Sequence, residues 1–236
     1  MREMGYVICL GGMIGVGKTS YTTLIAQHLN SEAFYESVDD NRLLDLFYND
    51  RERFAFPLQI YFLNTRFRSI KKAMRHKNNV LDRSIYEDAL FAKINFEDGM
   101  MKEAEFDCYL DLLHNMLEEI QELDHCTCPT GPKKRPDLFI YLRASFETIM
   151  ERIEKRGRDY EQDPSHVSYF RRLHSRYDDW VFNHYKESDV LIIDADRLDI
   201  TREEDAAEFL EILDAKLREV DEEETARLVQ KKVFYK

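Results

Sequence analysis

Residues 6–20 of the chain read Tyr6-Val7-Ile8-Cys9-Leu10-Gly11-Gly12-Met13-Ile14-Gly15-Val16-Gly17-Lys18-Thr19-Ser20. The apolar run Tyr6–Leu10 has the length of a buried strand, and the glycine-rich segment after it fits the pattern G-x-x-x-x-G-K-[ST]. A helix is predicted from Lys18. In such a unit the glycines let backbone N–H groups surround a phosphate, and the helix N-terminus adds partial positive charge. A chance match at a helix start is the alternative, but the flanking strand and helix favour phosphate binding.

We therefore expect Gly12 to Ser20 to contact the phosphates of a nucleoside triphosphate. Lys18 is predicted to reach the β- and γ-phosphates, and the Thr19 hydroxyl to be a ligand of Mg²⁺. Asp82, which ends the apolar run Asn79-Val80-Leu81, is predicted to hold the same ion through water. The guanine-selecting pattern N-K-x-D is absent from the sequence, which argues against a GTPase switch.

Short apolar runs alternate with long amphipathic stretches on both sides of this loop. Strands are predicted at Tyr6–Leu10, Glu32–Tyr35, Asn79–Leu81, Leu138–Leu142 and Val190–Ile193. Helices are predicted at Lys18–Leu29, Leu43–Tyr48, Arg53–His76, Ile85–Asn95, Lys102–Leu123, Phe146–Arg156, Asp163–Tyr185 and Glu203–Val220. This alternation predicts an α/β protein with the three-layer fold of P-loop NTPases, in which helices flank a parallel sheet of about five strands. We expect a single domain over residues 1–220 and a charged, solvated tail over 221–236.

Composition limits the classes of partner. The chain has 236 residues and a formal net charge of −12, which argues against general binding to nucleic acid or to anionic membranes. No apolar run is long enough to span a bilayer, and no targeting sequence is evident, so we expect a cytoplasmic protein. Cys9 and Cys108 are interpreted as core residues, and Cys126 and Cys128, beside His125, lack the second half of a metal site.

Three arginines follow the fourth predicted strand. Arg152 and Arg156 are four residues apart on one helix face, and Arg158 lies just beyond Gly157, which is expected to end that helix. Basic residues in a last helical turn also favour the helix dipole. Downstream of a phosphate loop, however, we interpret the segment 152–163 as a lid whose arginines neutralise the transferred phosphoryl group.

Two further residues follow predicted strands at the edge where ligands bind in such sheets. Arg83, directly after Asp82, is expected to steer an acceptor hydroxyl or to stabilise charge during transfer, although a surface ion pair is the alternative. Glu36 follows the second predicted strand and is a candidate to accept a proton from an attacking hydroxyl. An isolated glutamate at such a position is more often only solvated.

Taken together, these motifs resemble the deoxynucleoside kinase family (the deoxycytidine, deoxyguanosine and deoxyadenosine kinase group) over about residues 5–215. The resemblance is closest to the bacterial deoxyadenosine kinases, through Asp82-Arg-Ser-Ile-Tyr-Glu-Asp-Ala-Leu-Phe-Ala-Lys93 and Arg152-Ile-Glu-Lys-Arg-Gly-Arg158. The family often has Glu-Pro-Val where this chain has Glu36-Ser37-Val38. That difference removes a backbone restraint but keeps the carboxylate.

The resemblance implies a role for each matching position. Glu36 is implied as the general base for a 5′-hydroxyl. Arg83 is implied as the group that hydrogen-bonds both this hydroxyl and the carboxylate of Glu36. The nucleoside-binding residues implied are Tyr48 and Glu161 at the sugar 3′-hydroxyl, Gln59, Arg66 and Asp88 at the nucleobase edge, and Phe91 stacked on the base. Arg152, Arg156 and Arg158 match the lid, and Asp194, Ala195 and Asp196 the loop near the donor base. Without the family register, Tyr48 and Phe91 are better read as core residues.

The implied reaction is ATP-Mg²⁺-dependent phosphorylation of a 2′-deoxynucleoside, with deoxyadenosine preferred and deoxycytidine or deoxyguanosine secondary. The resemblance also implies a homodimer and feedback inhibition by a deoxynucleoside triphosphate, here dATP. Two alternatives remain open: a nucleoside monophosphate kinase, whose acceptor phosphate Glu36 would repel, and a non-catalytic nucleotide-binding partner protein. The loop Cys126–Pro136 and the acidic run Asp221–Glu224 receive no function from the sequence.

Overall fold

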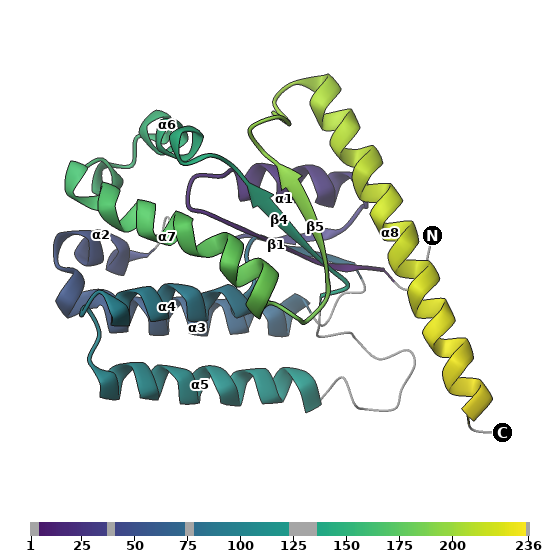
Figure 1. Ribbon diagram of the computed structural model, residues 1–236, viewed down its shortest axis with the longest axis horizontal. Coiled ribbons are helices and arrows are strands. Elements are labelled where there is room, and N and C mark those ends of the chain that lie inside the picture. The colour runs from purple at the N-terminus through teal and green to yellow at the C-terminus, as the bar shows by residue number, and fades with distance from the viewer. Residues whose placement is uncertain (1–4, 37–40, 74–77, 123–135, 235–236) are drawn as a thin grey trace.

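The computed structural model describes residues 5–36, 41–73, 78–122 and 136–234 (Figure 1). Its described part contains one parallel five-stranded sheet in the order β2-β3-β1-β4-β5. The strands are β1 (Val7–Gly12), β2 (Glu32–Phe34), β3 (Asn79–Leu81), β4 (Leu138–Arg143) and β5 (Asp189–Asp194). The predicted parallel α/β sheet is confirmed, and each predicted strand lies within three residues of its observed bounds.

The strand order explains where ligands can bind. β1 is central, with Cys9 opposite Leu81 of β3 on one side and Phe139 of β4 on the other. After β1 the chain forms the edge strand β2, returns to place β3 between β2 and β1, and then adds β4 and β5 on the other side of β1. The loop after Gly12 therefore lies where the sheet order reverses, which is the position of ligand sites in open α/β sheets.

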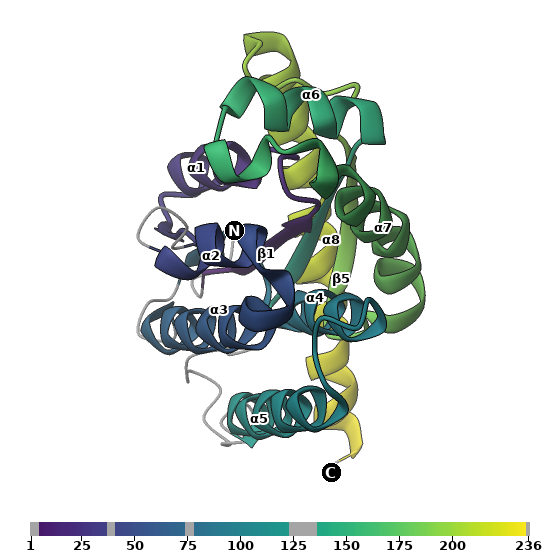
Figure 2. The ribbon, with the colours of Figure 1, turned by 90° about the vertical axis from the view of Figure 1, so that its left-hand side faces the viewer.

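Helices flank this sheet (Figures 1 and 2). They are α1 (Lys18–His28), α2 (Arg42–Asn49), α3 (Arg51–Ala73), α4 (Asp88–Glu97), α5 (Glu103–Glu122), α6 (Phe146–Arg156), α7 (Val167–Asp179) and α8 (Glu203–Phe234). Tyr21 of α1 meets Phe209 of α8 edge-on, with ring centroids 4.9 Å apart. Figure 2 shows α5 farthest from α6, outside α3 and α4. The sheet is thus covered by helices, and α5 packs mainly against the helices α3 and α4.

Two predicted helices are interrupted. The segment from Asp163 to Tyr185 comprises a 3₁₀ turn (Pro164–His166), then α7, then a π-helical turn (Trp180–His184). Asp163 caps this segment as predicted, because its carboxylate accepts from the backbone N–H of Ser165. The helix predicted from Ile85 likewise begins with a 3₁₀ turn over Ile85–Glu87 before α4.

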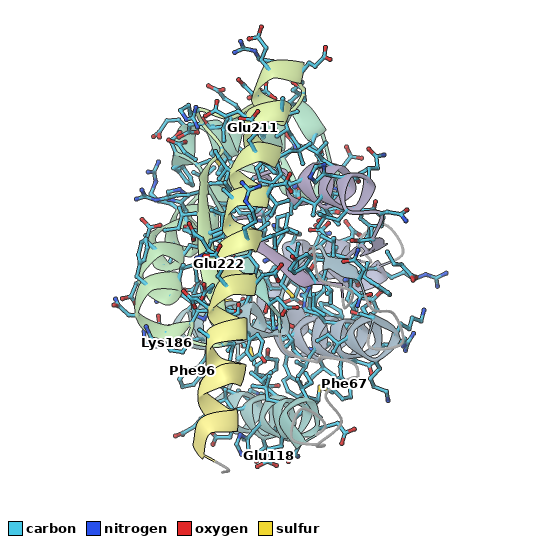
Figure 3. The ribbon with its side chains drawn as sticks, turned by 90° about the vertical axis from the view of Figure 1, so that its right-hand side faces the viewer. Phe67, Phe96, Glu118, Lys186, Glu211 and Glu222 are labelled. Carbon is cyan, nitrogen blue, oxygen red and sulfur yellow. The ribbon has the colours of Figure 1, made fainter. Side chains whose placement is uncertain are left out.

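The predicted end of the last helix at Val220 is wrong, because α8 continues to Phe234. The Tyr6 hydroxyl donates to the Asp221 carboxylate at 2.6 Å, so the first residue of the predicted tail contacts the start of the chain. Figure 3 shows Glu211 and Glu222 along α8, on either side of the predicted boundary. Amphipathic periodicity fades after Leu217, and this loss of pattern is why the prediction stopped early.

Other predictions lie partly outside the described residues. Cys126, Cys128, His125, Ser37 and Val38 lie outside them, as does most of the loop Cys126–Pro136. Within the described ranges, no helix is long and apolar enough to cross a membrane. The cellular location stays a prediction.

Gly11 gives a test of how closely β1 and β4 approach. A Cβ atom at Gly11 would lie 2.1 Å from Cζ of Phe139. We expect Gly11→Ala to lower the free energy of unfolding by about 1–3 kcal/mol, because overpacking in a closed core costs this amount. Chemical denaturation measures the change.

The matched control adds Phe139→Leu, which removes the ring that the new methyl group would meet. The loss in the double variant should be smaller than the sum of the two single losses. Strictly additive losses would show that the contact does not determine the cost.

Candidate active site

A cavity of about 610 Å³ opens at the carboxyl ends of β1, β2 and β3. It brings together most of the predicted site residues from distant parts of the sequence. Those that line it are Ile14, Gly15, Gly17, Lys18, Thr19, Ser20, Glu36, Tyr48, Gln59, Arg66, Asp82, Arg83, Asp88, Phe91, Arg152, Arg156, Arg158 and Glu161. The predicted juxtaposition is therefore present, while the role of each residue stays a prediction.

The phosphate loop has the backbone that its glycines allow. Gly15 and Gly17 have φ angles of 85° and 105°, in the left-handed region that favours glycine. Lys18, the first residue of α1, folds back so that Nζ donates to the carbonyl oxygens of Gly12 and Met13 at 2.9 and 3.0 Å. Burial lowers the pKa of Lys18 to about 7, with Arg83 adding to the effect and nearby carboxylates opposing it. An incoming phosphate would favour the charged amine.

Thr19 and Asp82 meet beside this lysine. The Thr19 hydroxyl donates to Oδ2 of Asp82 at 2.6 Å. The second carboxylate oxygen of Asp82 is buried and has no hydrogen-bond partner among the described residues. Burial also raises the pKa of Asp82, as expected for a carboxylate short of partners. This hydroxyl and unpaired oxygen fit a divalent cation whose remaining ligands are water and phosphate.

Four charged side chains form a cluster at the wall of the cavity: the buried Arg66, Arg83 and Asp88, and the partly exposed Glu36. Arg66 binds Asp88 through two parallel hydrogen bonds of 2.7 Å and donates to Glu36 at 3.1 and 3.2 Å. Arg83 donates from Nε to the other oxygen of Glu36 at 3.3 Å. The carboxylate of Glu36 is thus held by two guanidinium groups in a fixed orientation.

The cluster sets the charge of its acids. Burial alone would raise the pKa of Glu36, but Arg83, Arg66 and Lys18 outweigh it and lower that pKa to about 2. Burial raises the pKa of Asp88 to about 6, with Arg66 opposing the rise. Glu36 is therefore ionised at neutral pH, and the two hydrogen bonds from Arg66 favour the ionised form of Asp88.

Sequence reasoning missed Glu87 and Tyr177. Both are buried, and the Tyr177 hydroxyl accepts from Nη1 of Arg83 at 3.0 Å and donates to Glu87 at 3.2 Å. A pattern could have indicated Glu87: Ser84 and Glu87 have capping-box spacing, and the structure shows that box. Nothing in the sequence could have indicated Tyr177, because it lies on α7, more than ninety positions after Arg83.

The outer half of the cavity is lined by rings and by lid residues. Tyr48 of α2 stacks on Tyr160 with centroids 5.4 Å apart, and Phe91 of α4 lies under the Arg83 guanidinium at 4.8 Å. Gln59 of α3 is buried at the wall, and its side-chain amide makes no hydrogen bond to the described residues. Its amide is therefore free to pair with a ligand.

The lid arginines have different surroundings. Nη2 of Arg156 pairs with Glu161 at 2.5 Å, and Arg158 lies 4.0 Å from the same carboxylate. Arg152 donates instead to two backbone carbonyls, those of Val16 at 2.8 Å and Ala195 at 2.7 Å. Arg156 and Arg158 thus both face the Glu161 carboxylate, a partner that phosphate oxygens could replace. Arg152 instead joins the phosphate loop to the loop after β5.

The loop Asp194–Asp196 does not line the cavity. Asp194 accepts from the backbone N–H groups of Asp196 and Arg197, and Asp196 accepts from that of Ser145 at 2.7 Å. These two carboxylates hold their own loop together. The predicted contact of this loop with a donor base stays a prediction.

Comparisons with known proteins agree with this geometry. Residues 8–216 match the family described as deoxynucleoside kinase. A deoxyguanosine kinase of Lactobacillus johnsonii is 48% identical over 91% of this chain and 93% of that protein. A deoxyadenosine kinase of Lactobacillus acidophilus is 45% identical over 91% of this chain and 97% of that protein.

A solved structure resembles the fold over nearly its full length. It is a deoxyadenosine kinase from M. mycoides with bound dATP, which superposes with a TM-score of 0.74 at 27% identity, over 88% of this chain and 99% of that one. The sheet, the cavity residues and the similarity over most of the sequence lead to one conclusion: the chain belongs to the deoxynucleoside kinase family.

Proposed function

We propose that this deoxynucleoside kinase transfers the γ-phosphoryl group of ATP to the 5′-hydroxyl of a purine 2′-deoxynucleoside, with deoxyadenosine preferred. The observation that carries the proposal is the position of Glu36. Its carboxylate, held by Arg66 and Arg83, lines the same cavity as Lys18 and the phosphate loop. A hydroxyl placed against this carboxylate faces a phosphate bound at the loop.

Catalysis at this site depends mainly on positioning and charge, as is general for phosphoryl transfer. Glu36 is ionised at neutral pH and accepts a hydrogen bond from the acceptor hydroxyl, which orients an oxygen lone pair toward the phosphorus. It takes the proton late, once bonding to phosphorus has made the hydroxyl acidic. Lys18, Arg156 and Arg158 neutralise charge on the phosphoryl oxygens.

Mg²⁺ is part of the proposal. Thr19 and the unpaired oxygen of Asp82 would hold it beside the phosphates. When bound, the ion supplies positive charge that offsets the phosphate oxygens and fixes their geometry. The positive charge of the ion would add to that of Lys18 in offsetting the carboxylate of Asp82.

The preference for deoxyadenosine follows from the far end of the cavity. All four hydrogen bonds of Arg66 go to Glu36 and Asp88, so this arginine is largely satisfied by protein acceptors. Asp88 is an acceptor that suits an exocyclic amine and disfavours a carbonyl oxygen. The Gln59 amide offers one donor and one acceptor, which match the N1 and N6 edge of adenine. Because relatives include both deoxyguanosine and deoxyadenosine kinases, the choice between purines needs a direct test.

A homodimer and feedback inhibition by dATP remain part of the proposal. The resemblance supports both, and the M. mycoides structures include complexes with dATP and with dCTP. The monophosphate kinase alternative is disfavoured, because the ionised Glu36 carboxylate would repel a phosphate at the position where that alternative requires one.

Glu36→Gln tests the reaction. We expect kcat to fall by about 10²–10⁴-fold, the usual contribution of a positioned acid–base group, with deoxyadenosine affinity changed by less than about fivefold. Coupled ADP release measures kcat, and calorimetry measures affinity. Glu211→Gln, an exposed substitution on α8, is the control and should leave both unchanged. Retention of full turnover by Glu36→Gln would contradict the assigned role.

Three acceptors test the nucleobase preference: deoxyadenosine, deoxyguanosine and deoxyinosine. Deoxyinosine shares the carbonyl of guanine but lacks its amine, so it isolates the effect of the carbonyl. We expect kcat/KM to be about tenfold higher with deoxyadenosine than with either carbonyl purine, since a buried unpaired polar group costs about 1–3 kcal/mol. Preference for both carbonyl purines would overturn the assignment of Asp88 and Gln59 but leave the kinase reaction intact.

A further inference from the structure

Glu87 is a fully buried carboxylate that no step of the reaction uses. It ends the 3₁₀ turn that follows Arg83, and its side chain is 0% exposed. Oε1 accepts from the backbone N–H of Gly12 at 3.0 Å, from Nη1 of Arg83 at 3.2 Å and from the Tyr177 hydroxyl at 3.2 Å. Oε2 accepts from the backbone N–H of Ser84 at 3.1 Å.

These four contacts come from three separate elements. Gly12 ends β1 and begins the phosphate loop, Arg83 and Ser84 follow β3, and Tyr177 belongs to α7. The close approach to β1 depends on Gly11, where a Cβ atom would lie 3.1 Å from the carboxyl carbon of Glu87. Glu87 therefore joins the donor side of the site to the arginine on its acceptor side through one rigid group.

Arg83 needs such a partner. Its φ angle of 123° is unusual for a residue with a side chain, so surrounding contacts must hold its backbone. Its guanidinium is shared between Glu36, through Nε, and the pair Glu87 and Tyr177, through Nη1. The second set of contacts fixes the direction in which Nε meets Glu36.

The site around Glu87 presents hydrogen-bond donors to both carboxylate oxygens. All four of its partners donate to it, and a carboxylate has acceptors on both oxygens. A glutamine of the same shape would set its own N–H₂ group against a donor. The negative charge also offsets the buried charge of Arg83, which removal of a partner would leave uncompensated.

We propose that Glu87 is a positioning residue that fixes Arg83 relative to the phosphate loop and so aligns the acceptor hydroxyl at Glu36 with the donor phosphate. This role rests on the proposed function. It concerns alignment in the reaction rather than affinity for either substrate, because Glu87 does not line the cavity.

Glu87→Gln is the first test. We expect kcat, counted per nucleotide-binding site, to fall by about 10–100-fold, the scale of a small misplacement of reacting groups. KM for ATP and for the deoxynucleoside should change by less than about threefold. Tyr141→Phe is the control: it removes a neighbouring, partly buried hydroxyl that bonds Asp178 rather than Glu87 or Arg83, and it should leave kcat unchanged.

A double variant separates positioning from a merely structural role. If Glu87 acts through Arg83 on Glu36, its substitution should cost little further in kcat once Glu36→Gln is present. Equal fold losses in both backgrounds would overturn the proposal. An unchanged kcat per binding site, with only a loss of folded protein, would overturn it as well.

Tyr177→Phe keeps the test decisive where Glu87→Gln fails to fold. It deletes one donor to Glu87 and one acceptor of Arg83 while keeping the ring. We expect kcat to fall by about 3–10-fold with both KM values kept, and wild-type kcat would contradict the proposal. If the unmodified chain shows no acceptor-dependent turnover, the proposed function and this role are both overturned. If the unmodified chain turns over and the variant keeps the same kcat, only the role of Glu87 is overturned.

Discussion

The ion pairs of Arg83 with Glu36 and Glu87 are the interactions on which the site depends. A buried guanidinium is costly unless anions and acceptors surround it, and here the two carboxylates approach it from different sides, with the Tyr177 hydroxyl beside one of them. Glu36 faces the cavity, whereas Glu87 faces the sheet and the end of β1. The charge that orients the acceptor is therefore anchored to the strand that carries the phosphate loop.

Other cations that line the cavity are likewise bonded to acceptors of the protein itself. Lys18 is bonded to backbone carbonyls, Arg66 to Asp88 and Arg156 to Glu161, so each of these cations has a protein acceptor. Phosphate oxygens compete with these acceptors, and the competition is strongest where the acceptor is a neutral carbonyl. Lys18 can thus exchange its partners at small cost, whereas the bidentate Arg66–Asp88 pair is more resistant and is suited to a fixed wall.

The sequence predicted the sheet and the cavity well because both follow from local rules. Strand–loop–helix spacing placed Lys18 and Thr19, and the carboxyl ends of β2 and β3 placed Glu36, Asp82 and Arg83 at one edge. The side chains of Asp194 and Asp196 bind their own loop and Ser145, and the predicted contact of this loop with the donor base stays a prediction. Tyr177 reaches the site through tertiary packing that no local pattern encodes.

The strand order also bears on how the chain folds during synthesis. β1, β2 and β3 are complete by residue 81, but the other neighbour of β1 arrives only with residues 138–143. The Tyr6–Asp221 hydrogen bond then joins positions 215 residues apart. Such long sequence separations slow folding, because loop closure precedes the contacts that stabilise it. During synthesis, the edge of β1 that pairs with β4 therefore stays unpaired until residues 138–143 are made. In this period aggregation through the open edge competes with completion of the sheet.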